Sequence, residues 1–196
     1  MVNPKNYFSQ PTKGFTLIEL LVVIAILAVL MSVVVITINP AEMLKKSRDS
    51  RRVSDLDALR TALNLYLSED LTFTLADPAK AYASIPQASA GQCSPTLSYC
   101  GAGKTCYCTT TASYRNVDAT GWAPVNFKAI TLGSALSALP IDPTNNATYY
   151  YLFAASSSKF ELNAKLEAVS NVSLMANDGG STSTWYEIGS DLTILN

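Results

Sequence analysis

The first 69 residues fall into three segments with different distributions of apolar and polar side chains. Residues 1–14 are polar, and residues 15–38 are almost entirely apolar, with Glu19 as their only charged side chain. A helix of that length measures about 36 Å at about 1.5 Å per residue, which is enough to cross a bilayer core of about 30 Å. The run is too long and too uniformly apolar for the alternative, a buried helix of a soluble protein. We therefore predict a transmembrane helix over residues 15–38.

A second helix is predicted over residues 39–69. Asn39 suits the N-cap and Pro40 the first helical position, while Glu42 lies where an acidic side chain supports the first turn. Further along, apolar side chains recur at spacings that place them on one helix face. This apolar stripe consists of Leu56, Leu59, Leu63 and Tyr66. We expect an amphipathic helix whose stripe packs against a globular head.

The head is expected over residues 70–196. Its first part, residues 70–135, is rich in Ala, Ser, Thr and Gly and is interrupted by prolines. Such composition predicts loops, with at most a short strand or helix.

The second part of the head has clearer strand patterns. Residues 148–154 are rich in strand-forming side chains, and residues 160–167 alternate between apolar and polar. A serine turn lies between them, so the two runs predict a hairpin. Residues 184–188 are expected to add a third strand, and residues 192–195 are a candidate fourth. The predicted fold class is α+β, with a long N-terminal helix packed on a small antiparallel sheet.

Charge and composition argue against several classes of function. The chain contains no histidine, which excludes Ser-His-Asp and Cys-His catalysis and histidine-ligated metals. Its net charge is −1, so bulk charge does not favour nucleic-acid binding. Residues 42–60 carry six basic and four acidic side chains, whereas residues 61–196 carry six basic and ten acidic ones. We expect a protein that is not an enzyme and needs no nucleic acid.

The four cysteines gather within one short stretch of the head, at Cys93, Cys100, Cys106 and Cys108. A zinc site is the alternative to disulfides, but it usually has paired Cys-x2-Cys spacing, which is absent. A bond between Cys106 and Cys108 would close a very tight ring. Two pairings stay open: Cys93–Cys106 with Cys100–Cys108, or Cys93–Cys108 with Cys100–Cys106. Disulfides in turn favour an oxidising, extracytoplasmic compartment.

The run Lys13-Gly14-Phe15-Thr16-Leu17-Ile18-Glu19 places a basic residue and a glycine directly before the apolar segment. It resembles the processing site of the type IV pilin and type II secretion pseudopilin family. The resemblance implies that a prepilin peptidase recognises Lys13 and Gly14, removes the leader 1–14 and methylates the new amino group of Phe15. Glu19 corresponds to the acidic residue that this family keeps near its new N-terminus.

The resemblance also gives Glu19 a physical role. A charge within a spanning helix costs about 2.5–3.5 kcal/mol, so it needs a partner. The new ammonium group on Phe15 of a neighbouring subunit is the expected partner. At about 4 Å and an effective dielectric constant near 20, their attraction is about 4 kcal/mol before desolvation. Glu19 would then set the stagger between stacked helices during assembly.

A calcium site is a further candidate in the C-terminal part of the head. The run Asn177-Asp178-Gly179-Gly180-Ser181, with Asp191 downstream, offers oxygen ligands, although its spacing is not that of an EF-hand. An ordinary glycine turn between two strands is the alternative. No other cofactor is expected.

Taken together, these patterns lead to a structural subunit of a type IV pilus-like filament. Its expected partners are identical or related pilin subunits, the prepilin peptidase, an inner-membrane assembly platform and, before assembly, membrane lipid. It would begin as a single-pass precursor of the cytoplasmic membrane with the head outside, and end in an extracellular filament. The alternatives are a major pseudopilin of type II secretion and a membrane-anchored binding module that does not polymerise.

Overall fold

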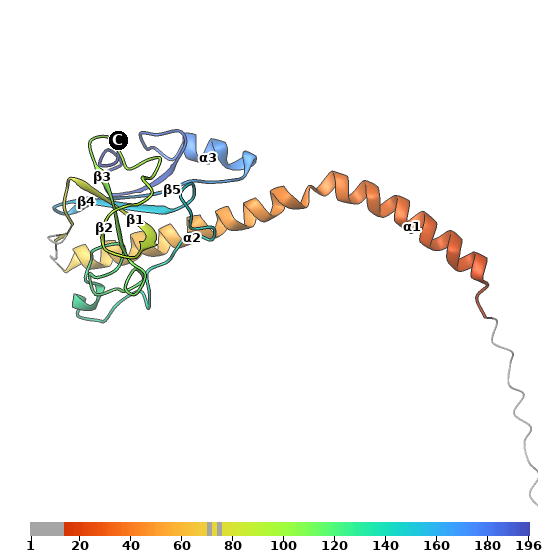
Figure 1. Ribbon diagram of the computed structural model, residues 1–196, viewed down its shortest axis with the longest axis horizontal. Coiled ribbons are helices and arrows are strands. Elements are labelled where there is room, and N and C mark those ends of the chain that lie inside the picture. Colours follow the sequence, from red (N-terminus) through yellow and green to blue (C-terminus); the bar gives the residue numbers. More distant parts are fainter. Residues whose placement is uncertain (1–13, 70–71, 74–75) are drawn as a thin grey trace, which may run out of the picture. The chain divides into compact units, whose positions relative to one another are not determined.

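A computed structural model describes residues 14–69, 72–73 and 76–196 of the chain (Figure 1). Residues 1–13 of the predicted leader therefore lie outside the described residues. The chain divides into two compact units, Met1–Met43 and Leu44–Asn196. Each unit is described separately below.

The first unit consists mainly of helix α1, Leu17–Ile38. Thr16 is its N-cap, and Asn39 ends it in the left-handed conformation with φ of 47°, which asparagine tolerates better than most residues. The large apolar side chains described along α1 are all exposed within the chain. Residues Leu17–Val35 form a helix long and apolar enough to cross a membrane. The predicted apolar helix is confirmed, and its surface needs lipid or protein to cover it.

Helix α2, Pro40–Ser68, begins at the predicted proline. The backbone N–H of Glu42 donates to the carbonyl oxygen of Asn39 at 3.0 Å, which supports the first turn. In the second unit, α2 lies along one face of the sheet (Figure 1). The predicted apolar stripe is confirmed, because its four members are all buried: Leu56, Leu59, Leu63 and Tyr66.

The head contains a six-stranded sheet with the strand order β2-β3-β1-β4-β5-β6. The strands are β1 (Lys80–Gln87), β2 (Gly91–Gln92), β3 (Thr105–Thr110), β4 (Tyr151–Ser156), β5 (Lys159–Ala164) and β6 (Tyr186–Gly189). The short helices are η1 (Phe127–Ala129), η2 (Val169–Asn171) and α3 (Val172–Ala176).

The predicted α+β class is confirmed, but the sheet is mixed and not antiparallel throughout, because β1 and β3 pair in parallel. These two strands also show that residues 70–135 are more ordered than their composition indicated. Pro86 gave the misleading signal, since proline cannot donate a hydrogen bond to a neighbouring strand. It lies near the end of β1, where the register with β3 shifts between Ala83 and Gln87. This irregularity accommodates Pro86 one residue before the strand ends at Gln87.

The C-terminal strands follow the prediction closely. Strands β4 and β5 form the expected hairpin, with Ser157 at φ of 57° in the turn between them. Strand β6 pairs antiparallel with β5 and is the predicted third strand. Residues 192–195 form a turn and not the candidate fourth strand, but Leu195 is fully buried.

Both faces of the sheet are covered. Phe160 and Leu162 of β5 pack on the side of α2, whereas Tyr150 and Leu152 belong to a second core on the other face. Glu161 of β5 is therefore fully buried, although the alternating pattern predicted that it would meet solvent. Burial raises the pKa of the Glu161 carboxyl group, because the charged form loses its hydration.

The second core contains both disulfides, Cys93–Cys108 and Cys100–Cys106, with Cα–Cα distances of 4.9 and 5.2 Å. This is one of the two pairings that the sequence left open. The ring closed by Cys100–Cys106 lies against the last residues of the chain: the N–H of Ala102 donates to the carbonyl oxygen of Asn196 at 2.6 Å. The hydroxyl of Tyr99 donates to the carbonyl oxygen of Leu195. The disulfide ring therefore holds the C-terminal residues on this face.

Candidate functional site

The predicted processing site lies in an open segment before α1. Gly14 and Phe15 are both exposed, Phe15 to 86 %. A Cβ atom added to Gly14 would meet no other atom within 4 Å. Lys13 lies outside the described residues. Within the chain, the bond between Gly14 and Phe15 is therefore accessible to an external enzyme.

The first turn of α1 contains a reciprocal hydrogen-bonded pair, Thr16 and Glu19. The backbone N–H and the hydroxyl of Thr16 donate to Oε2 of Glu19 at 2.9 and 2.8 Å. In return, the backbone N–H of Glu19 donates to the hydroxyl oxygen of Thr16 at 3.3 Å. This is a capping box, in which two N–H groups of the first turn are satisfied by side chains.

The capping box adds Thr16 to the predicted site. A threonine followed three residues later by glutamate is the sequence signature of this arrangement, so the signal was readable. The box holds the carboxylate of Glu19 at the helix N-terminus, where the helix dipole favours negative charge. Only Oε2 is used: in the described residues Oε1 of Glu19 accepts no hydrogen bond. That oxygen is available to a cationic partner.

In a comparison with protein families, residues 10–35 match the prokaryotic N-terminal methylation motif. This range contains the processing site, the capping box and most of α1. The match supports the predicted resemblance of this segment to the type IV pilin and pseudopilin family. No curated protein and no solved structure matched the chain.

The pilin-like precursor thus has an apolar helix that fits membrane anchoring, and its motif implies cleavage by a prepilin peptidase. Gly14, Phe15, Thr16 and Glu19 lie in one continuous segment at the start of α1, and together they form the candidate site.

The head of this pilin-like chain is joined to α2 by a buried ionic network around Arg52. The guanidinium group of Arg52 contacts Asp142 through Nε at 2.6 Å and through Nη2 at 2.9 Å. It also contacts Asp49 at 2.9 Å and Glu167 at 2.7 Å. The side chain of Arg52 has no solvent exposure. Arg52 is therefore buried within the head, although its neighbour Arg51 is 65 % exposed.

Glu167 links this network to a second arginine, Arg48. The lowered pKa of its carboxyl group predicts that the stability of the head depends on pH. Hydrogen bonds from Arg48 and Arg52 lower the pKa of Glu167 from 4.5 to about 2. Because the folded-state pKa lies below the ordinary value, this stabilisation is complete above pH 4.5 and is lost as the pH falls toward 2. We expect the unfolding free energy of the wild-type chain in detergent to fall over this interval.

The matched variant is Glu167→Gln, which keeps the shape of the side chain but does not titrate. Its unfolding free energy should depend less steeply on pH than that of the wild type, when measured by urea titration at several pH values. Arg48→Met should also reduce the slope, since it removes the main cause of the shift. An unchanged slope in both variants would contradict this assignment.

The candidate calcium ligands already have other partners. Oδ1 of Asp178 accepts from the N–H of Gly180 and Oδ2 from the N–H of Glu187, both at 2.8 Å. Asp191 forms an ion pair with Lys159 at 2.9 Å. Within the residues that the structure describes, no three acidic, cysteine or histidine side chains gather as a metal site would require. The segment around Asp178 is a turn before β6, with Gly179 at φ of 90°.

Proposed function

We propose that this chain is a structural subunit of a type IV pilus-like filament. It is made as a prepilin, is cleaved after Gly14 and methylated at Phe15, and polymerises through α1. The role is structural, and no residue of the chain is assigned a catalytic function. Before assembly the precursor would lie in the cytoplasmic membrane as a single-pass protein with its head outside.

The observation that carries this proposal is a carboxylate held at the start of an exposed helix in which Glu19 is the only charged side chain. An apolar surface of this length is stable only in lipid or against other apolar surfaces. Lipid covers the apolar side chains but supplies no partner for Glu19 at the depth of the hydrocarbon. A bundle of identical helices covers them equally well and can supply a cation.

Cleavage would create that cation. Before processing, Phe15 has an amide N–H in a peptide bond; afterwards it carries an ammonium group four residues from Glu19. Oε2 of Glu19 stays bonded to Thr16, and Oε1 can accept from the ammonium group of a neighbouring subunit. Pairing in the low-dielectric interior compensates part of the desolvation cost of both groups. Processing and assembly are thereby coupled through one ion pair.

The proposal is tested by substituting Gly14 with valine. Because a Cβ atom at Gly14 meets nothing within 4 Å, the folded chain itself tolerates the change. We expect the peptidase to reject the variant, so that its N-terminus stays at Met1 and the sheared extracellular fraction contains no subunit. The measurement is mass spectrometry of the N-terminal peptide from the sheared fraction and from membranes, with the wild type alongside.

Methylated Phe15 in the wild-type sheared fraction, together with intact precursor in the Gly14→Val membranes, would support the proposal. An intact Met1 terminus in the wild type, confined to membranes, would contradict it and leave the anchored, non-polymerising module. A sheared Gly14→Val filament with an uncleaved leader would contradict the proposed coupling of cleavage to assembly.

A further inference from the structure

Two small pockets open on either side of one loop of the head, residues 115–121. The first has a volume of about 290 Å³ and is lined by residues 115–118 together with Lys128, Ser137 and Ala138. The second has a volume of about 310 Å³ and is lined by residues 119–121 together with side chains of β1 and β3. Each lies near the lower limit of ligand-pocket sizes, about 300 Å³, so each fits a small chemical unit.

The loop between the pockets is fixed by many short-range contacts. The side-chain amide of Asn116 donates to the hydroxyl oxygen of Thr120 at 2.9 Å, and that hydroxyl donates to Asp118 at 2.6 Å. A Cβ atom on Gly121 would lie 2.0 Å from the carbonyl oxygen of Asn116, so only glycine fits there. Ala119 has φ of 71°. Such a loop is ordered before any ligand arrives, which reduces the entropy lost on binding.

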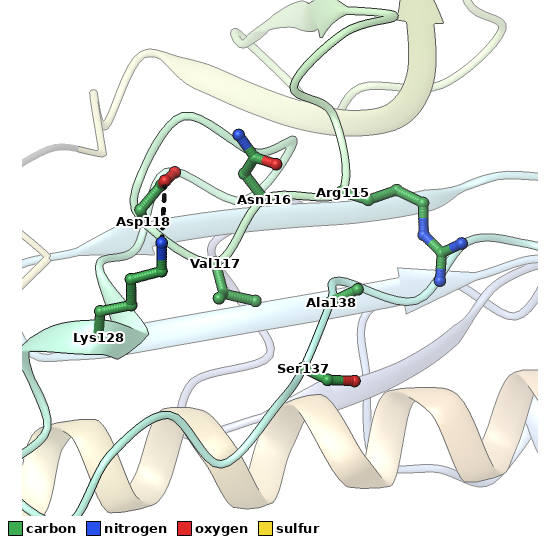
Figure 2. A pocket seen from close by; sticks show the side chains of 7 residues that line it. All are labelled: Arg115, Asn116, Val117, Asp118, Lys128, Ser137 and Ala138. Carbon is green, nitrogen blue, oxygen red and sulfur yellow. Dashed lines mark hydrogen bonds and ion pairs between the residues drawn. The ribbon is translucent and has the colours of Figure 1, made fainter.

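The residues that line the first pocket place charged side chains on two sides of it. Figure 2 shows Arg115 at one end, the Lys128–Asp118 pair at the other, and Val117 and Ala138 between them. Nε of Arg115 donates to the carbonyl oxygen of Leu139 at 3.1 Å, which holds the guanidinium group in place. In the part of the chain that the structure describes, its two terminal nitrogens carry no hydrogen bond. They are therefore available to a carboxylate, which the planar guanidinium group binds with two parallel bonds.

Local charge favours an anion at this pocket even though the head as a whole is acidic. Two cations line it, and a single carboxylate, Asp118, neutralises one of them through Lys128 at 3.3 Å. The apolar side chains of Val117 and Ala138 form a surface for the carbon skeleton of the ligand.

The second pocket has the lining that polyhydroxylated rings require. It combines the phenol rings of Tyr82 and Tyr107 with the hydroxyl groups of Thr109 and Thr120. Lys80 lies 5.1 Å from the centre of the Tyr107 ring. In the described residues the hydroxyl of Tyr107 has no hydrogen-bond partner. The hydroxyls of Thr109 and Thr120 already donate within the chain, to the carbonyl oxygen of Thr120 and to Asp118. Aromatic carbon and the phenol hydroxyl of Tyr107 are therefore the groups that can contact the C–H face and a hydroxyl of a sugar.

We propose that the two pockets form one binding surface for an acidic oligosaccharide. One sugar residue places its carboxylate against Arg115, and the chain continues over the loop so that another residue reaches Tyr107. The inference concerns the head alone and does not depend on filament formation.

The test measures binding of hexagalacturonate to the full chain in detergent micelles by titration calorimetry at constant ionic strength. We expect Arg115→Gln to weaken binding about tenfold, the usual effect of losing a charge-assisted pair. Arg51→Gln is the matched control, since it removes one exposed arginine from α2, and it should change the affinity less than about twofold. Lys128→Gln provides a second variant at the pocket, and it leaves the Arg115–Leu139 contact in place.

Two further binding measurements test whether the ligand spans both pockets and whether its charge is required. Tyr107→Phe should weaken hexagalacturonate but leave galacturonate monomer unaffected, because only the longer ligand spans both pockets. Neutral maltohexaose should not bind. The proposal is overturned if hexagalacturonate does not bind, if Arg115→Gln and Arg51→Gln weaken it equally, or if inorganic phosphate competes as well as galacturonate. It is also overturned if Arg115→Gln changes self-association without sugar, which would make the pocket a contact between copies of this chain.

Discussion

Replacing Arg52 with methionine is expected to lower the unfolding free energy of the head by about 3–5 kcal/mol. Methionine fills most of the space but leaves the carboxylates of Asp49 and Asp142 buried without their cation. Arg52 contacts Asp49 on its own helix and two acidic side chains from distant parts of the sequence, Asp142 and Glu167, so its loss affects α2 and two head segments together. The measurement is urea unfolding of the full chain in detergent, followed by fluorescence of the buried Trp122 and Trp185.

The neighbouring residue supplies the control. Arg51→Met removes the same charge from a side chain that is 65 % exposed and lies 3.7 Å from Asp55. Exposed pairs of this kind contribute about 0–1 kcal/mol, so the control should differ little from the wild type. Equal destabilisation by the two variants would show that the buried network has no special role in stability.

Replacing Glu19 with alanine is expected to reduce the yield of sheared filament at least tenfold while leaving cleavage after Gly14 intact. The variant loses an attraction of about 4 kcal/mol to a neighbouring ammonium group before desolvation is counted. It also loses the cost of holding a carboxylate in lipid, about 2.5–3.5 kcal/mol, so the monomer has less reason to leave the membrane. Both effects act against assembly. The measurement is quantification of the subunit in sheared and membrane fractions, with its N-terminus determined in each.

Ser32→Ala is the matched control within the same apolar helix. The hydroxyl of Ser32 donates to the carbonyl oxygen of Val29 in its own chain at 2.7 Å, so its removal changes polarity without affecting a proposed contact between subunits. Its filament yield should equal that of the wild type. A normal yield from Glu19→Ala would mean that the carboxylate is not required for polymerisation.

The sequence predicted those elements that depend on local periodicity. The uniformly apolar run gave α1, the stripe beginning at Leu56 gave the buried face of α2, and the alternation from Phe160 gave β5. The same alternation was misleading for Glu161, because periodicity identifies two different faces of a strand and cannot tell whether the polar face is also covered. Here the cysteine-rich segment and the C-terminal residues cover it.

Contacts between residues far apart in the chain could not be predicted from local periodicity. The parallel contact between β1 and β3 depends on a connection of cysteine-containing loops and not on the helical crossover that usually joins parallel strands. The burial of Arg52 depends on Asp142 and Glu167, which lie about 90 and 115 residues away in the sequence. Its charge and helical position alone gave no sign that it would be buried. By contrast, the N-terminal methylation motif could be recognised from the sequence, since its residues are contiguous.

The position of β1 between β3 and β4 has a consequence for the timing of synthesis. About 60 residues separate the end of β1 from the start of β4. The apolar stripe of α2 also becomes buried only after β4 and β5 have been synthesised, because these strands pack against it. At about 5–20 residues per second, the ribosome takes several seconds to supply these partners. Helix α1 emerges long before then. The nascent chain can therefore contact a membrane through α1 while its head is still unfolded, as the proposed position of the head outside the membrane would require.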